Sequence, residues 1–280
     1  MKLSANLIAA VLAGTALAAP SDRTLERIRA RALARQSHPL DSTAPAAPAA
    51  EPHTQFRTAT TDASPNITWS KNWAGAVREK PPPGASYTAV TATFTVPEAT
   101  AVAGVAGMQA GSAWVGIDGD TYPTAILQAG VDFYVEDGKH TYDAWYEWFP
   151  DVAYDFRLPI ARGDVLVVKV ESRSPAEGVA IIENRTSRQT VTKTLRAPAP
   201  TATLAGQNAD WIVEDFQYGD GMVQLVDFDS LAFSGAVARA GGKSYGVRDA
   251  TIVEMEQNGK RRTRTTVVSN TELVVEYLRE

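Results

Sequence analysis

The 280-residue chain contains no cysteine. It can form no disulfide, no thiolate nucleophile and no cysteine-ligated metal site, so a hydrophobic core alone must hold its fold. Histidine is almost as scarce, with three in the whole chain. Only His140 lies beyond residue 60, in a predicted turn beside Gly138, where an exposed turn histidine is the ordinary interpretation.

Several hydrolase signatures are missing as well. A serine nucleophile would need His140 as its base, and the chain has no H-E-x-x-H for zinc and no D-T-G or D-S-G for a paired-aspartate site. Carboxylate and amide side chains are what remains for hydrolysis, and we expect neither a metal nor a cofactor.

Apolar runs of about 18 residues, the length that spans a membrane, do not occur. A shorter apolar run over residues 7–17 follows Lys2 and overlaps the small-residue sequence Ala16-Leu17-Ala18. This pattern is typical of a secretory signal peptide over residues 1–18. We therefore expect a secreted, extracellular protein with no membrane partner, and a monomer by default.

A basic surface is lacking beyond the leader. Residues 1–54 hold six of the 27 basic and four of the 32 acidic groups, which leaves 21 basic and 28 acidic groups in the remainder. Such an acidic body argues against nucleic acid as a partner. The leader differs, because five arginines and spaced apolar residues predict a short basic amphipathic helix over residues 21–36. We interpret residues 19–60 as propeptide and linker, and expect the basic propeptide to dock on the acidic body as its inhibitor.

Residues 61–280 have the pattern of one all-β domain. Short alternating segments are separated by turn signals such as Asp137-Gly138 and Asn258-Gly259. We predict a β-sandwich of two antiparallel sheets, of the concanavalin A-like or jelly-roll type. Residues 251–257 and 260–268 are expected to form a hairpin, and residues 99–111 a flexible loop open to cleavage. Asn66 and Asn184 lie in glycosylation sequons.

Polar and aromatic residues alternate through residues 112–154. In residues 124–133 the even positions are mainly polar or small, with Gln128 at their centre, and the odd positions are apolar. This predicts a half-buried strand. In the next predicted strand Asp143, Trp145 and Glu147 share one face. Two neighbouring strands would then line one surface with carboxylates, an indole and an amide.

Four motifs carry a family resemblance. They are WVGIDGD at residues 114–120, AILQ at 125–128, YDAWYEW at 142–148 and WIVEDF at 211–216. Together, in this order, they resemble the fungal glutamic peptidases, or eqolisins (peptidase family G1), over about residues 72–277. The resemblance implies a β-sandwich whose concave side binds an extended peptide, and a catalytic dyad of Gln128 and Glu214. It also implies activity in acid and insensitivity to pepstatin.

The implied mechanism gives each dyad member one task. Glu214 takes a proton from the attacking water and later delivers it to the leaving nitrogen, while Gln128 donates to the oxyanion. We expect the substrate, a protein or peptide, to be bound by residues clustered around these two: Trp114, Asp118, Asp132, Asp143, Trp145 and Glu147. The family often carries cysteines near residues 121–124 and 133–135, where this chain has Tyr122, Pro123 and Tyr134.

Two alternatives remain open from the residues alone. A glycoside hydrolase on a similar sandwich would use Glu147 and Glu214 as its carboxylate pair, with tryptophans stacking on sugar. A carbohydrate- or peptide-binding module would need no catalytic residue at all. Gln128→Ala separates them, because only a glutamic peptidase loses nearly all activity from that change.

Overall fold

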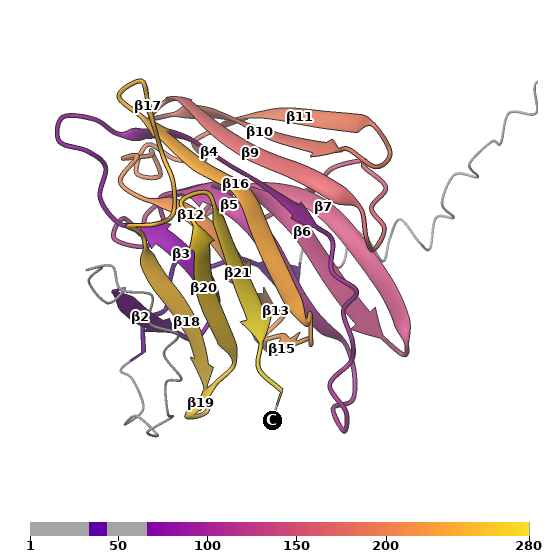
Figure 1. Cartoon of the computed structure of the whole chain (residues 1–280). Helices are drawn as coiled ribbons and strands as arrows, with labels where there is room; N and C mark the ends of the chain where they lie inside the picture. Colours follow the sequence, from indigo (N-terminus) through magenta and orange to yellow (C-terminus); the bar gives the residue numbers. More distant parts are fainter. Residues whose placement is uncertain (1–33, 44–65, 280) are drawn as a thin grey trace, which may run out of the picture.

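The computed structural model describes residues 34–43 and 66–279, which form two stacked β-sheets. Figure 1 shows these sheets lying face to face. The predicted β-sandwich is therefore confirmed. The expected signal peptide and most of the expected leader helix and linker lie outside the described residues. Within the described ranges, no helix is long and apolar enough to cross a membrane.

The larger sheet has ten strands, and two of them carry Gln128 and Glu214. Its main path runs β19 (Lys260–Arg261), β18 (Thr251–Gln257), β3 (Trp73–Arg78), β12 (Ala209–Glu214), β5 (Gln109–Ile117), β6 (Ile126–Glu136), β7 (Lys139–Phe149) and β8 (Tyr154–Asp155). Two short strands join it in parallel, β2 (Ile67–Ser70) beside β18 and β15 (Gln224–Leu225) beside β5. The pairs along the main path are antiparallel.

The second sheet has eight antiparallel strands. Its path runs β11 (Gln189–Arg196), β10 (Glu177–Asn184), β9 (Val165–Ser174), β4 (Tyr87–Thr95), β16 (Ser230–Ala240), β21 (Glu272–Tyr277) and β20 (Thr263–Ser269), with β17 (Lys243–Tyr245) beside β16. A small third sheet consists of β1 (Arg35–Gln36), β13 (Gln217–Tyr218) and β14 (Gly221–Met222). It attaches the N-terminal segment to the body of the sandwich.

Strand alternation divides the larger sheet into two faces. The odd-numbered residues of β6, among them Leu127, Val131 and Phe133, pack in the core between the sheets. Trp211 also lies in this core, where its Nε1 donates to Thr91 O of the opposite sheet at 3.0 Å. The even-numbered residues of β6 therefore face outward. That outer face has its own apolar cluster, which includes Trp73, Trp114 and Trp145.

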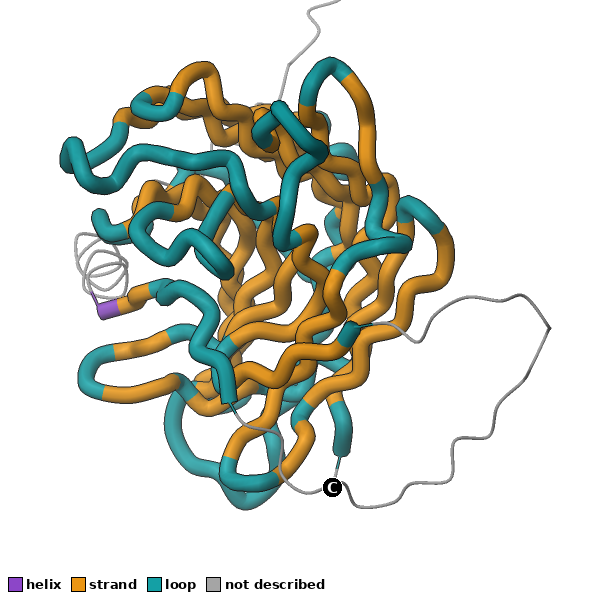
Figure 2. The backbone as a smooth tube through the Cα atoms, turned by 90° about the vertical axis from the view of Figure 1, so that its left-hand side faces the viewer, coloured by secondary structure: helices purple, strands orange, loops and turns teal. Residues whose placement is uncertain are grey.

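The outer face is covered, which the alternating pattern of β6 did not predict. Strand β6 is buried over Ile126–Val135, on both faces rather than one. The segment of residues 34–43 crosses this face: Arg35 contacts Asp132, and Leu40 N donates to Gly119 O at 3.1 Å. In Figure 2 it is the short tube that starts at the purple end and passes in front of the strands.

Two local predictions differ from the structure. The hairpin after Asn258 ends at β19, because β20 pairs with β21 in the other sheet; within the hairpin, Arg261 contacts Glu254 at 2.7 Å. The expected loop 99–111 is shorter, since residues 109–111 begin β5. Of the two sequon asparagines, Asn184 is buried, and its Nδ2 donates to Asp164 at 2.8 Å. Asn66 is exposed.

Candidate active site

The register of three central strands builds the site on the outer face of the larger sheet. Gln128 of β6 lies opposite Gly116 of β5 and Glu147 of β7. Two residues along β6, Gly130 lies opposite Trp114 and Trp145. Asp132 follows, opposite Ser112 and Asp143. Because side chains two apart share a face of a strand, these side chains are neighbours.

Strand β12 adds Glu214 to this surface. Glu214 lies opposite Ser112 of β5 and Trp73 of β3. Its side chain is fully buried, and Trp114 donates from Nε1 to its Oε2 at 2.9 Å. The sequence order WIVEDF thus sends Trp211 into the core and Glu214 to the outer face, three positions apart on an alternating strand.

Two glycines make room for the Trp114 indole. A Cβ on Gly130 would lie 2.3 Å from Ala113 O and 2.5 Å from Trp114 Cβ. A Cβ on Gly116 would lie 2.8 Å from Trp114 Cζ3. With hydrogen at both positions, the indole lies across the sheet and reaches Glu214.

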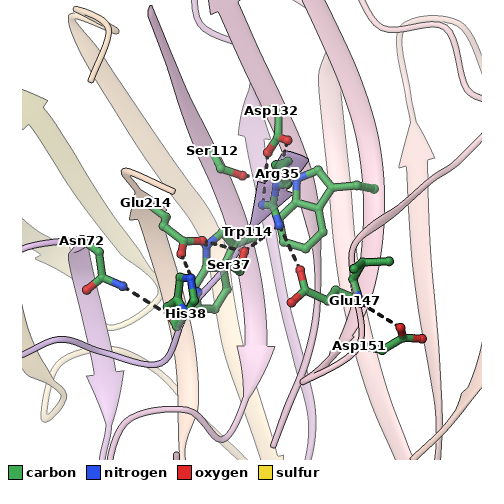
Figure 3. Close-up of polar contacts among 12 residues, drawn as sticks. Arg35, Ser37, His38, Asn72, Ser112, Trp114, Asp132, Glu147, Asp151 and Glu214 are labelled. Carbon is green, nitrogen blue, oxygen red and sulfur yellow. Dashed lines mark hydrogen bonds and ion pairs between the residues drawn. The ribbon is translucent and has the colours of Figure 1, made fainter. Parts of the chain in front are cut away.

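The carboxylate of Glu214 accepts three hydrogen bonds. Besides Trp114, Ser37 donates from Oγ to Oε2 at 2.9 Å, and the backbone N–H of His38 donates to Oε1 at 3.2 Å. Burial raises the pKa of Glu214 to about 7, although Arg35 and the three donors oppose the shift. Figure 3 shows Ser37 and His38 converging on Glu214.

Gln128 is buried without a well-formed hydrogen bond. Its side chain has 0% exposure, and among the described residues neither Oε1 nor Nε2 has a hydrogen-bond partner of good geometry, although the amide lies close enough to Glu147 to lower the pKa of that carboxyl group. Buried amides are normally satisfied, so an orphaned amide at the centre of a polar surface marks a position where a ligand group binds. This feature makes Gln128 available to a substrate.

Arg35 fills the part of the site that β6 and β7 form. Its Nε donates to Asp132 Oδ2 at 3.0 Å and its Nη1 to Glu147 Oε2 at 2.9 Å. The guanidinium carbon lies 3.9 Å from the centre of the Trp145 ring and 5.0 Å from that of Phe216. Burial raises the pKa of Glu147 to about 8, and Arg35 opposes that shift.

The rest of the segment is held along its length. Arg35 and Gln36 pair with Tyr218 and Gln217 of β13. Asn72 donates from Nδ2 to the carbonyls of His38 and Pro39, at 3.3 and 3.2 Å. The segment therefore lies in the site as an extended peptide, from Asp132 past Glu214 to Gly119.

Most of the predicted substrate-binding residues come together, and Asp118 does not join them. Trp114, Asp132, Trp145 and Glu147 lie around the segment, and Asp143 lies opposite Asp132 at the edge of the set. The carboxylate of Asp118 instead accepts four backbone N–H bonds from residues 205–208, at 2.6 to 3.2 Å. It holds that loop and has little capacity left for substrate.

The sequence reasoning missed three contributors. Tyr134 donates from its hydroxyl to Asp132 Oδ2 at 2.9 Å, Phe216 lies against Arg35, and Asn72 binds the segment's carbonyls. Tyr134 was detectable, because it lies two positions after Asp132 on the same face. Among the described residues, no group of three or more His, Asp or Glu side chains has the arrangement of a metal site.

Comparisons with known proteins identify the family of this chain. The family described as the Peptidase A4 family matches residues 71–277. Aspergillopepsin-2 of Aspergillus niger is 43% identical, over 99% of this chain and 100% of its own length, and scytalidopepsin B of Scytalidium lignicola is 34% identical over 96% of both.

Two solved structures have the same fold. Scytalido-glutamic peptidase, crystallised with a transition-state analogue inhibitor, superposes with a TM-score of 0.67 at 35% identity, over 74% of this chain and 98% of that one. Aspergilloglutamic peptidase from Aspergillus niger gives a TM-score of 0.58 at 49% identity, over 61% and 99%. The chain therefore belongs to the Peptidase A4 family, the glutamic peptidases or eqolisins, and is a hydrolase acting on peptide bonds.

Proposed function

We propose that the chain is a secreted acid endopeptidase in which Glu214 and Gln128 form the catalytic dyad. One observation carries the proposal: the backbone nitrogen of an extended peptide, His38 N, already lies 3.2 Å from Glu214 Oε1. A substrate bound along the same path places its scissile nitrogen beside a carboxyl group that can protonate it once the nitrogen has become pyramidal and inverted in the tetrahedral intermediate. The orphaned amide of Gln128 lies on the same face and is free to bind the carbonyl oxygen.

Glu214 transfers one proton from the attacking water to the leaving nitrogen. As a carboxylate it takes a proton from water while the water oxygen attacks the carbonyl carbon. The Gln128 N–H stabilises the negative charge on the carbonyl oxygen. When the C–N bond breaks, Glu214 returns the proton to the leaving nitrogen. Peptide carboxylate and amine are the products.

Glu214 must be ionised in acid to begin this cycle. Its raised pKa of about 7 belongs to the covered site, where burial is the largest cause. Departure of residues 34–43 admits water and removes part of that burial, which lowers the pKa. The N–H of Trp114 remains as a donor to the ionised form. The base thus becomes effective when the segment has left.

We further infer that the propeptide over residues 19–60 inhibits the enzyme. Residues 34–43 occupy the site, and Arg35 neutralises two of its buried carboxylates. A substrate and this segment exclude each other.

Digestion of a denatured protein from acid to neutral pH, with pepstatin present, tests the dyad. Wild type is expected to cleave in acid, whereas Glu214→Gln and Gln128→Ala, once shown to be folded, lose at least about 100-fold in kcat. Normal cleavage by Gln128→Ala overturns the dyad. A mild effect of Gln128→Ala with complete loss in Glu147→Gln is the result that a glycosidase-type carboxylate pair gives.

A further inference from the structure

The hydroxyl of Ser37 accepts one hydrogen bond and donates another. It accepts a hydrogen bond from Arg35 Nη1 at 2.6 Å and donates to Glu214 Oε2 at 2.9 Å. Ser37 and Glu214 are both buried, at 2% and 0% exposure. A general base holds its water by such a hydrogen bond, at about 2.6 to 3.2 Å. The Ser37 oxygen therefore lies where that water belongs.

Besides the displaced water, cleavage lacks a hydrogen-bond donor to the carbonyl oxygen of the bond that would break. Hydrolysis of the Ser37–His38 bond needs a donor on the carbonyl oxygen of Ser37. The amide of Gln128 has no hydrogen bond of good geometry in the described part of the chain, so it does not hold this carbonyl. The leaving nitrogen is in place, but both the water site and the oxyanion contact are wrong for reaction.

Arg35 sets this arrangement. Its guanidinium is fixed by Asp132, Glu147 and the Trp145 ring, and the same group bonds the Ser37 hydroxyl. One intervening residue, Gln36, pairs with β13 and spans the distance between them. The unit that determines the geometry is thus Arg-x-Ser.

We propose that Arg-x-Ser is an inhibitory recognition sequence for this enzyme: the cleft binds peptides that contain it and does not hydrolyse them, because the serine hydroxyl replaces the attacking water. This rests on the proposed function of Glu214. It applies to residues 35–37 of the chain and equally to separate peptides of this class. Replacing Ser37 by alanine removes the hydroxyl, which readmits water, and it also breaks the Arg35–Ser37 hydrogen bond, so that the carbonyl of residue 37 is free to turn toward Gln128. Water then adds to the carbonyl carbon, the C–N bond to His38 breaks, and the proton passes through Glu214 to the His38 nitrogen.

Synthetic decapeptides of residues 34–43 test the proposal against the full-length chain after activation in acid and removal of its released leader. The wild-type peptide is compared with Ser37→Ala and with the matched control Ser42→Ala, since Ser42 is exposed and outside the catalytic contacts. Inhibition of a separate protein substrate gives Ki, and mass spectrometry detects cleavage after residue 37. The same Ser37→Ala change in the full chain is followed by mass spectrometry after a shift to acid pH.

Wild-type and Ser42→Ala peptides are expected to inhibit and remain intact. Ser37→Ala is expected to bind about tenfold or more weakly and to be cut between residues 37 and 38. Equal cleavage of wild-type and Ser37→Ala peptides overturns the proposal. So does weaker inhibition by Ser37→Ala without cleavage, which identifies Ser37 as a binding contact only. Absence of any activity on the separate substrate contradicts the proposed function itself.

Discussion

At the scale of single residues, the site depends on what surrounds each polar group. Trp114 illustrates this, because its indole packs against Trp73 with ring centres 4.9 Å apart while its N–H serves Glu214. That N–H bonds the ionised form and lowers the pKa of Glu214. Trp114 therefore supports the fold and tunes the base, two roles that substitution can separate.

Trp114→Phe is expected to keep the packing and lose the donor. Without the N–H, the pKa of Glu214 rises and the acid limb of the kcat/KM profile moves to higher pH. We expect activity in acid to fall about 10-fold or more, as for loss of a hydrogen bond to a charged group. The pH dependence of kcat/KM measures the shift.

Trp145→Phe is the matched control. The Trp145 N–H donates to Ser112 Oγ at 3.2 Å rather than to Glu214. This variant is expected to change KM and leave the acid limb in place. An acid limb that is unmoved in Trp114→Phe contradicts the assigned role of its N–H.

At the scale of elements, alternation made much of the site predictable. The registers of β6 and β7 place Gln128, Asp132 and Glu147 on one face, as the sequence pattern indicated. Which neighbouring strand each residue meets was not predictable, because strand order depends on contacts far apart in the chain. The exit of β20 to the other sheet shows this limit, since a good turn at Asn258-Gly259 does not determine where the next strand pairs.

The N-terminal segment shows a different limit. A helical pattern was predicted up to residue 36, yet Arg35 and Gln36 form a strand with β13. Burial of the Arg35 guanidinium between two carboxylates and an aromatic ring outweighs a weak helical propensity. The buried outer face of β6 has the same cause, because a covering segment has no signature in the strand it covers.

Gly130→Ala tests the packing at the centre of β6. The added methyl group would lie 2.3 Å from a backbone oxygen, and the backbone cannot move aside as a flexible side chain can. We expect a loss of about 3 kcal/mol or more in the free energy of unfolding, measured in urea. Gly221→Ala, where a Cβ meets nothing within 4 Å, is expected to be neutral and serves as the control.

Arg35→Gln tests the electrostatic part of segment docking. Arg35 lowers the pKa of both Glu147 and Glu214 relative to the same site without it. Binding of the Arg35 side chain therefore favours the ionised forms of these groups. The contribution of Arg35 to the binding free energy of the segment is present while they are ionised and is lost as pH falls. The ratio of the Kd values of the Arg35→Gln and wild-type peptides of residues 34–43 is expected to decrease about tenfold or more from pH 9 to pH 6, the range that contains the pKa values of about 8 and about 7. A constant ratio contradicts this account.

At the scale of the whole molecule, buried carboxyl groups make the stability of the fold depend on pH. Burial raises the pKa of Glu147 to about 8 and of Glu214 to about 7, and raises those of Asp210 and Asp215 well above their ordinary value. Asp210 is the extreme case, because it is fully buried and neither of its oxygens has a hydrogen-bond partner among the described residues. An ionised carboxylate there is strongly disfavoured.

The numbers of protons bound by the folded and unfolded states determine how stability changes with pH. In the unfolded chain these groups lose their protons near pH 4 to 4.5, whereas the folded chain keeps them to higher pH. The folded state then binds more protons, so its stability is complete below about pH 4 and declines as pH rises toward 8. We expect the free energy of unfolding of the full chain to fall by about 3 kcal/mol or more over this window.

Asp210→Asn isolates one contributor to that decline. Asparagine has nearly the same shape and stays neutral, so the variant is expected to flatten the pH dependence and to gain stability at pH 7 relative to wild type. The control Asp249→Asn changes an exposed carboxylate and is expected to leave the slope unchanged. Urea unfolding at pH 4 and pH 7 measures all three proteins. An Asp210→Asn variant that is destabilised equally at both pH values contradicts the buried neutral acid, because a loss independent of pH indicates a packing defect rather than a titrating group.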